Sequence, residues 1–294
     1  MLGRAYASDI RARLQGQPPQ QLHLDPTLGE LAIRQWQSGV VAVGARRHDG
    51  TNQLRGSGWL VDVPSGLVCT SAHVILDCVG RDDSSVGKSL LDPAVHGVAI
   101  GVGIGEQIRW WCRATLRYYS MPGTDYPAQA PSSWPAAGDA LRLDIAVLQL
   151  VNWDGSPLNP SLADAAAPQW HRTGEGAIAL PLGRSADLSE GDTLVMLGYG
   201  QDLTVGRNAP YTSTTCRGYY SGRFSDHTGE WLKADMRMLS GHGGGPVLNR
   251  HGEVIGLAIK SSRETSRNLS MLRSIEAVVA PIEKVRAGVN RVLL

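Results

Sequence analysis

The stretch G-H-G-G-G-P at residues 241–246, followed directly by V-L-N at 247–249, is central to the interpretation of this 294-residue sequence. Two further segments belong with it, T-S-A-H at 70–73 and L-D-I-A-V-L at 143–148. Each segment alone is weak evidence, so the interpretation rests on all three and on their order.

The two earlier segments each place one ionisable side chain next to a predicted strand. His73 follows a strand candidate at 67–70, and Asp144 stands at the start of an otherwise apolar strand. Burying a carboxylate is unfavourable unless it is paired, and an imidazole N–H is a suitable partner. The two segments therefore predict a His73–Asp144 pair.

Short β segments surround these motifs, punctuated by Gly and Pro. This spacing favours an all-β barrel or sandwich. Residues 119–139, rich in Pro, Ser, Ala and Gly, are predicted to form a long surface loop, and residues 152–173 to connect two barrels. Strands are predicted at 40–43, 58–63, 67–70, 109–116, 143–151, 193–197, 211–220, 231–236, 246–248 and 254–259.

Both ends of the chain carry helical patterns. We expect short helices at 8–14 and 28–36, separated by a Pro-containing linker at 17–21. Apolar residues at helical spacing over 274–292 predict a C-terminal helix, kinked at Pro281.

Composition excludes several classes of function. The formal net charge is +1 and no run of like charges stands out, so neither nucleic acid nor a membrane is expected as a partner. The four cysteines form no C-x-x-C pair and no zinc-ligand spacing with histidine, so we expect no metal and no cofactor. We interpret them as buried thiols in a reducing compartment. The N-terminus has no signal-peptide core, and no run of 18 apolar residues occurs, which favours a cytoplasmic protein.

The three segments resemble the motifs T-[AS]-A-H, D-I-A-[VL]-L and G-x-S-G-G-P of the trypsin-like (chymotrypsin-fold, S1-type) serine peptidases, which have the triad order His, Asp, Ser. The resemblance covers residues 38–265. It is closest to the bacterial, disulfide-free branch that includes the HtrA-like proteases, because K-A-D at 233–235 precedes the glycine motif and G-E-V-I-G-L at 252–257 follows it as a returning strand.

The resemblance implies an all-β fold: two six-stranded antiparallel β-barrels with the active site in the cleft between them, an N-terminal extension and a C-terminal helix. The expected boundaries are 1–37 for the extension and 38–265 for the peptidase domain. Barrel one would occupy about 38–152 and barrel two about 174–265, with the C-terminal helix at 266–294.

The resemblance also implies roles for individual residues. The catalytic positions are His73 as general base, Asp144 as the acid that orients its ring, and Gly243 where the nucleophilic serine stands in the family. The backbone N–H groups of Gly241 and Gly243 would form the oxyanion hole. Ser240, three residues upstream, is a poor substitute nucleophile because it lies on the wrong side of the oxyanion loop.

Substrate-binding residues follow from the same resemblance. Ile259, Lys260 and Ser261 match the strand that pairs with the substrate backbone. Arg237, six residues before the nucleophile position, falls near the floor of the S1 pocket. Either Arg237 lines that pocket and selects an acidic residue, or it points to solvent or pairs with Asp235.

Gly243 is the largest departure from the family pattern, because the hydroxymethyl group needed for an acyl-enzyme is missing. It has two explanations: deliberate inactivation of an active protease, or a natural pseudoprotease. Intact His73, Asp144 and Gly241 favour the first.

Three smaller departures concern regulation and compartment. His242 stands where secreted trypsins carry an Asp that pairs with the N-terminus created by zymogen cleavage. Activity would therefore be controlled by a partner, the N-terminal extension or an effector domain. Val74 stands where secreted relatives carry a Cys, which agrees with a cytoplasmic location. His73 and Asp144 are 71 residues apart, longer than is usual in the family.

The sequence therefore predicts a serine endopeptidase that cuts peptide bonds through a Ser-His-Asp triad, present here in a form inactivated at Gly243, as a regulated intracellular bacterial protease. The alternative is a natural pseudoprotease that acts as a peptide- or protein-binding module. The expected partners are a protein or peptide substrate and a regulatory partner or effector domain.

Overall fold

The computed structural model describes residues 26–47, 49–79, 97–104, 107–120, 143–156, 158, 177–200, 213–226, 229–261 and 269–288. The chain divides into two compact units, Met1–Arg34 and Gln35–Leu294. In the first unit the described part is the beginning of helix α2 (Pro26–Gln37), which confirms the helix predicted at 28–36. The predicted helix at 8–14 and linker at 17–21 lie outside the described residues, as do residues 121–139 of the predicted loop and residues 157 and 159–173 of the predicted connection.

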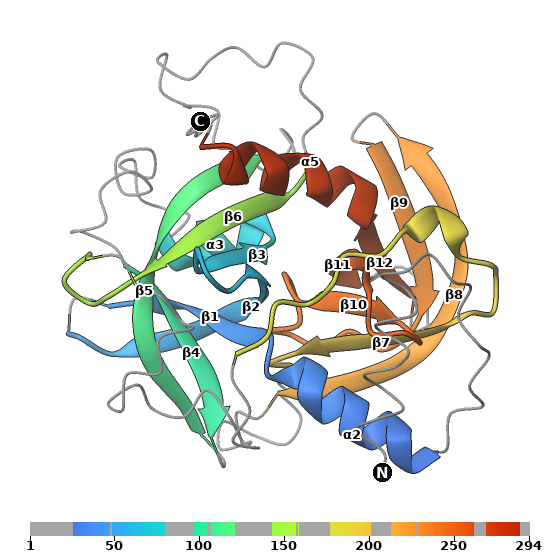
Figure 1. Cartoon of the computed structure of the whole chain (residues 1–294), viewed down its shortest axis with the longest axis horizontal. Helices are drawn as coiled ribbons and strands as arrows, with labels where there is room; N and C mark the ends of the chain where they lie inside the picture. The colour runs from blue at the N-terminus through green and yellow to red at the C-terminus, as the bar shows by residue number, and fades with distance from the viewer. Residues whose placement is uncertain are drawn as a thin grey trace. The chain divides into compact units, whose positions relative to one another are not determined.

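The first half of the second unit is a closed antiparallel barrel (Figure 1), in the order β1-β2-β3-β6-β5-β4. Its strands are largely buried, as in β2, where residues 56–61 are all buried, and the inward-facing side chains fill one core. That core includes the fully buried Val41, Leu60 and Leu148. The strands are β1 (Val40–Arg46), β2 (Asn52–Asp62), β3 (Leu67–Thr70), β4 (Val98–Ile104), β5 (Gln107–Ser120) and β6 (Ile145–Val151).

The second half forms another closed antiparallel barrel, in the order β10-β11-β12-β9-β8-β7. It has its own core, built around buried residues such as Met196, Leu232 and Ile255. The expected two-barrel, all-β fold is thus confirmed. The strands are β7 (Thr193–Gly198), β8 (Thr214–Asp226), β9 (Gly229–Asp235), β10 (Pro246–Asn249), β11 (Val254–Ser261) and β12 (Leu269–Ser274).

Helices connect and brace the barrels. Helix α5 (Ile275–Arg286) contacts β5 and β6 of the first barrel and β11 and β12 of the second, and it runs across both at the top of Figure 1. Arg286 at its end donates a hydrogen bond to the carbonyl oxygen of Val61 at 2.8 Å. The described residues also form helix α3 (Ala72–Val79) and the 3₁₀ turn η1 (Ser185–Asp187).

Strands β4 and β12 were not predicted, and the reasons differ. β4 reads V-A-I-G-V-G-I, an apolar run with two glycines that lacks strand alternation. β12 reads L-S-M-L-R-S and turns three polar residues inward, which hides its alternation. As a result the second barrel extends to Ser274 and α5 begins at Ile275, whereas the sequence placed the end of the barrel at 265 and helix from 266.

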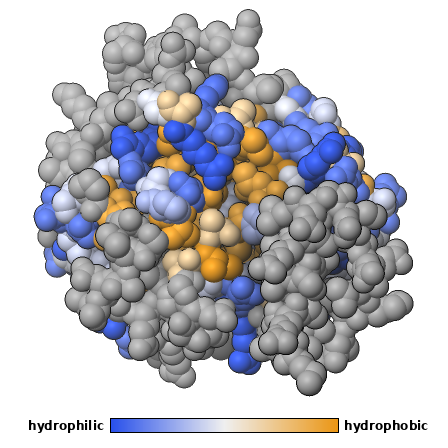
Figure 2. Space-filling view, in the orientation of Figure 1, coloured by the Kyte–Doolittle hydropathy of each residue, from blue (hydrophilic) through white to orange (hydrophobic). Residues whose placement is uncertain are grey.

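The surface carries both polar and apolar residues. Figure 2 shows hydrophobic residues near the centre of one face, with hydrophilic residues around them. Among the described residues, no helix combines the length and hydrophobicity needed to cross a bilayer. The same residues contain no cluster of three or more His, Cys, Asp or Glu side chains able to hold a metal ion. All four cysteines are free thiols, of which Cys69 and Cys112 are buried and Cys78 and Cys216 are half-buried.

Candidate active site

His73 is held at the start of a short helix that the core of the first barrel anchors. It is the second residue of α3, and Val74, Ile75 and Leu76 behind it are buried in that core. The side chain of His73 stays 25% exposed. A well-packed apolar helix therefore presents one polar side chain at its accessible end.

Both oxygens of the Asp144 carboxylate bind His73. Oδ2 accepts a hydrogen bond from the ring Nδ1 at 2.9 Å, and Oδ1 accepts one from the backbone N–H at 2.9 Å. This arrangement confirms the predicted pair, fixes the ring and leaves Nε2 as the acceptor. Asp144 precedes β6 rather than lying within it, with φ = 55° in the left-handed region that non-glycine residues rarely adopt.

The charge state of Asp144 follows from its surroundings. Burial would raise the pKa of this carboxyl group, but the charge and hydrogen bonds of His73 and the charge of Arg273 hold the pKa below its ordinary value. Asp144 is therefore ionised at neutral pH and available to stabilise an imidazolium on His73.

The glycine loop from the second barrel is fixed by Ser57 of β2 in the first. The Ser57 N–H donates to the carbonyl oxygen of Gly243 at 2.8 Å, and the Ser57 hydroxyl donates to that of Gly241 at 2.6 Å. The same hydroxyl accepts the N–H of Tyr199 at 2.8 Å. Gly241 has φ = 92°, and a Cβ there would lie 2.4 Å from the Tyr199 carbonyl oxygen, so only glycine fits.

The position of Gly243 relative to His73 defines the site. A Cβ built on Gly243 would lie 2.8 Å from Nε2 of His73. A side chain at position 243 would thus point at Nε2, the ring nitrogen that does not bind Asp144, and the imidazole would have to shift to make room for it. The Ser71 hydroxyl lies farther from Nε2, at 3.5 Å, and Ser71 is buried.

Two backbone donors in this loop are unused. Within the part of the chain that the structure describes, neither the Gly241 N–H nor the Gly243 N–H donates a hydrogen bond. Both predicted oxyanion-hole donors are therefore available to a ligand.

His242, between these two glycines, is fully buried and neutral. Its Nδ1 accepts the N–H of Leu239 at 2.9 Å, so Nε2 carries the proton and donates to the Thr214 hydroxyl at 2.6 Å. Thr214 in turn donates to the carbonyl oxygen of Gly198 at 3.1 Å. Burial lowers the pKa of His242 to about 4. The histidine thus ties the glycine loop to β7 and β8 through neutral hydrogen bonds.

The predicted substrate strand is β11. The pairing of β10 with β11 stops at Leu257, and the Gly244 N–H donates to the Ala258 carbonyl oxygen at 2.8 Å. Residues 259–261 run beyond this point, paired only with β12 among the described strands. Ile259 is buried, and the backbone of Lys260 and Ser261 lies in the strand.

Arg237 lies just after β9 with its side chain exposed. Its charge is close enough to Cys216 on β8 to oppose the rise in the pKa of that thiol that burial causes. It makes a further interaction within the chain. The structure therefore places Arg237 beside β8, and its predicted position near the floor of the S1 pocket stays a prediction.

Sequence reasoning missed three residues that shape the site: Ser57, Thr214 and Arg273. Ser57 had a usable signal, because it lies between two glycines inside a strand, a pattern typical of close backbone approach. A Cβ on Gly56 would lie 2.7 Å from the Gly243 carbonyl oxygen. Thr214 and Arg273 carry no comparable local signal.

The family model described as "Trypsin-like peptidase domain" matches residues 56–257, which include every group described above except Arg273 and the end of β11. The chain belongs to the trypsin-like peptidase family. Its two closed six-stranded antiparallel barrels match the chymotrypsin fold.

Related proteins match only part of this trypsin-like peptidase. Serine protease HTR4 from Rattus norvegicus is 37% identical over 78 residues, covering 26% of this chain and 16% of HTR4. The putative serine protease HhoA from Synechocystis is 33% identical over 98 residues, covering 33% of this chain and 24% of HhoA. The chain thus spans less than a quarter of these relatives.

Among solved structures, an HtrA-type protease with a bound tripeptide superposes with a TM-score of 0.54 at 14% identity. The superposition covers 87% of this chain and 63% of that one. At this identity the likeness establishes the fold of this peptidase and nothing finer.

Proposed function

We propose that this chain is the peptidase domain of a serine endopeptidase whose nucleophile has been lost at Gly243. One observation carries the proposal: a Cβ at residue 243 would lie 2.8 Å from Nε2 of His73, the ring nitrogen that does not bind Asp144. A serine at that position would present its hydroxyl to a base that is already oriented.

With serine at 243, the reaction follows from the positions of the groups. Nε2 of His73 takes the hydroxyl proton while Oγ attacks the peptide carbonyl carbon, and the carbonyl oxygen becomes an oxyanion. The N–H groups of Gly241 and Gly243 bind this oxyanion. The imidazolium then gives its proton to the leaving amine, and water, activated by the same nitrogen, releases the acid product and restores the serine.

The substrate class and setting extend the proposal. The open side of residues 259–261 on β11 would accept an extended peptide as an added strand. The relatives are named serine proteases, which favours a protein or peptide substrate. Four free thiols favour a bacterial cytoplasmic location. Neutral, buried His242 favours control by a regulatory partner or effector domain, rather than by a salt bridge to an N-terminus released by cleavage.

As written, the chain lacks the nucleophile. Triad-deficient sites of this kind keep about 10³ to 10⁴ over the uncatalysed rate through the oxyanion hole and binding. We attribute Gly243 to inactivation of an active parent. The second candidate, a natural pseudoprotease that holds peptides, is favoured by Gly243 itself. Sequencing the source gene separates the two, because a serine codon at position 243 excludes the pseudoprotease.

Restoring the nucleophile tests the enzymatic proposal. Gly243→Ser should make the protein react with a fluorophosphonate probe, with the adduct located at residue 243 by peptide mass spectrometry. The matched control adds His73→Ala to the restored protein and should abolish labelling. A folded Gly243→Ser protein that shows no adduct at residue 243, with or without peptide ligand present, would contradict the proposal.

A further inference from the structure

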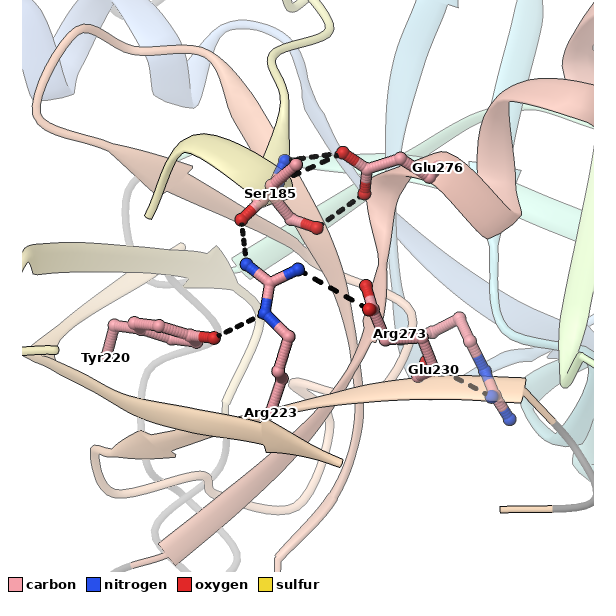
Figure 3. Close-up of polar contacts among 7 residues, drawn as sticks. Ser185, Tyr220, Arg223, Glu230, Arg273 and Glu276 are labelled. Carbon is pink, nitrogen blue, oxygen red and sulfur yellow. Dashed lines mark hydrogen bonds and ion pairs between the residues drawn. The ribbon is translucent and has the colours of Figure 1, made fainter. Parts of the chain in front are cut away.

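Arg273 is a fully buried cation in the second barrel, a placement that is costly unless the charge is compensated. It lies on β12, with its guanidinium 3.7 Å from the ring centroid of Trp231. Nη1 donates to the backbone carbonyl oxygen of Glu230 at 3.4 Å (Figure 3). Nε donates to the carbonyl oxygen of Leu143 at 3.1 Å, which belongs to the other barrel.

The carbonyl oxygen of Leu143 lies in the same peptide plane as the N–H of Asp144. The orientation of that plane sets φ of Asp144, which is 55°. The other side of Leu143 is held as well, since its N–H donates to the Ser120 hydroxyl of β5 at 3.0 Å. The residue before Asp144 is therefore fixed from one side by β5 and from the other by Arg273.

We infer that Arg273 is a positioning residue, which holds the Leu143–Asp144 peptide so that the Asp144 carboxylate meets His73. The charge of Arg273 acts in the same direction, because it lowers the pKa of Asp144 against the effect of burial. The inference rests on the proposed function only because it concerns the same His73–Asp144 pair.

Arg223 provides a matched comparison in the same part of the barrel. It donates to the Tyr220 hydroxyl at 3.1 Å and to the Ser185 carbonyl oxygen at 2.7 Å (Figure 3). It also reaches the carboxylate of Glu230 at 3.4 Å. Arg223 thus shares Glu230 with Arg273 but makes no contact with Leu143. Arg223 lies on β8 with its side chain 34% exposed, whereas Arg273 lies on β12 and is buried, so the two removals share the loss of a Glu230 contact on β9 and only the removal of Arg273 releases the Leu143–Asp144 peptide.

The test uses the chain with Gly243 and ¹⁵N-labelled histidine, so it needs no nucleophile. The Nδ1–H proton of His73, assigned by its loss in His73→Gln, is protected from solvent exchange by its bond to Asp144. We expect Arg273→Met to speed its exchange about tenfold, the equivalent of one lost hydrogen bond, and Arg223→Met to change it less than about twofold.

Two results would overturn the inference: a folded Arg273→Met protein whose His73 proton exchanges at the original rate, or an equal acceleration in Arg223→Met. If Arg273→Met does not fold, Arg273→Lys replaces it, because lysine keeps the charge but has no donor at the Nε position. There too, faster exchange supports the inference and unchanged exchange refutes it. The exchange rate of the His73 proton is measured without fluorophosphonate labelling at residue 243. A negative result in one experiment therefore leaves the other proposal intact.

Discussion

Mild acid should destabilise this chain through one buried side chain, His242. The folded protein holds the imidazole neutral, with Nδ1 accepting from Leu239 and Nε2 donating to Thr214. Protonation would place a second donor against the Leu239 N–H and a charge in an apolar site. The folded pKa, lowered to about 4, is below the ordinary 6.5, so the unfolded chain binds more protons between these values. Neutral His242 therefore contributes its full stabilisation of the folded state above pH 6.5, and this stabilisation is lost as the pH falls toward 4.

The magnitude follows from the two pKa values. The full difference between 6.5 and about 4 corresponds to about 3 kcal/mol of unfolding free energy. At pH 5.0 about 2 kcal/mol of it is already lost. Carboxyl groups with lowered pKa values, such as Asp144 and Glu276, also stabilise the folded state. This stabilisation is lost mainly below pH 4.5, because the ordinary pKa values of the two groups are 3.8 and 4.5. The window from pH 7.0 to 5.0 therefore reports mostly on histidine.

The assay compares urea unfolding at pH 7.0 and pH 5.0 for the chain and for His242→Asn. Asparagine keeps an acceptor near the Leu239 N–H but does not titrate, so the other histidines contribute equally to both proteins. We expect the chain to lose about 2 kcal/mol more than the variant between the two pH values. Equal losses, or a His242 imidazole that titrates near pH 6.5 by NMR in the folded chain, would refute this account of the buried histidine.

Two further predictions concern the loop and the triad. Ser57→Ala should lower the free energy of unfolding by about 2–3 kcal/mol, because the Gly241 carbonyl and the Tyr199 N–H lose the hydroxyl that binds them. Urea unfolding measures this loss, and Ser221→Ala on the exposed face of β8 is the control. A loss no larger than that of the control would contradict the prediction. In the Gly243→Ser background, Asp144→Asn should slow fluorophosphonate labelling by about 10⁴, because the His73 ring loses the carboxylate that accepts its Nδ1–H. If stopped-flow or gel assays show that the labelling rate falls by less than tenfold, Asp144 does not act as a triad member.

The predicted part of the site consists of groups whose signal is local. His73 follows a strand within a recognisable four-residue motif, and Asp144 is a lone acid before an apolar strand. The glycine loop at 241–246 is contiguous. Burial and backbone constraint act directly on these short segments, so their chemistry could be inferred from the residues and their family resemblance. The same holds for the strands that alternate at least in part, such as β5 and β8.

The unpredicted part depends on partners that are distant in sequence. Ser57 binds Gly241 across 184 residues, and Arg273 binds Leu143 across 130. The glycines on both sides of Ser57 indicate a close backbone approach but not its partner, and no local pattern marks the contact between Arg273 and Leu143. Arg273 also removed a signal, since an inward-facing arginine in β12 breaks the apolar alternation by which the strand would have been found. A single buried cation thus accounts for both a missed strand and a missed site residue.

The loop that carries Gly243 owes its shape to neighbours rather than to a side chain at that position. Ser57 holds the carbonyl oxygens on both sides of His242, and His242 is tied to Leu239 and Thr214. None of these bonds involves an atom that serine would add. If serine stood at position 243 in a parent protein, as we propose, loss of its hydroxyl would remove the nucleophile while leaving the N–H groups of Gly241 and Gly243 and the His73–Asp144 pair in place. With nothing on Gly243 to displace it, the imidazole sits so close that a Cβ would be only 2.8 Å away. The restored serine must displace the ring slightly, so fluorophosphonate reactivity in Gly243→Ser also measures how rigidly Asp144, and behind it Arg273, hold that ring.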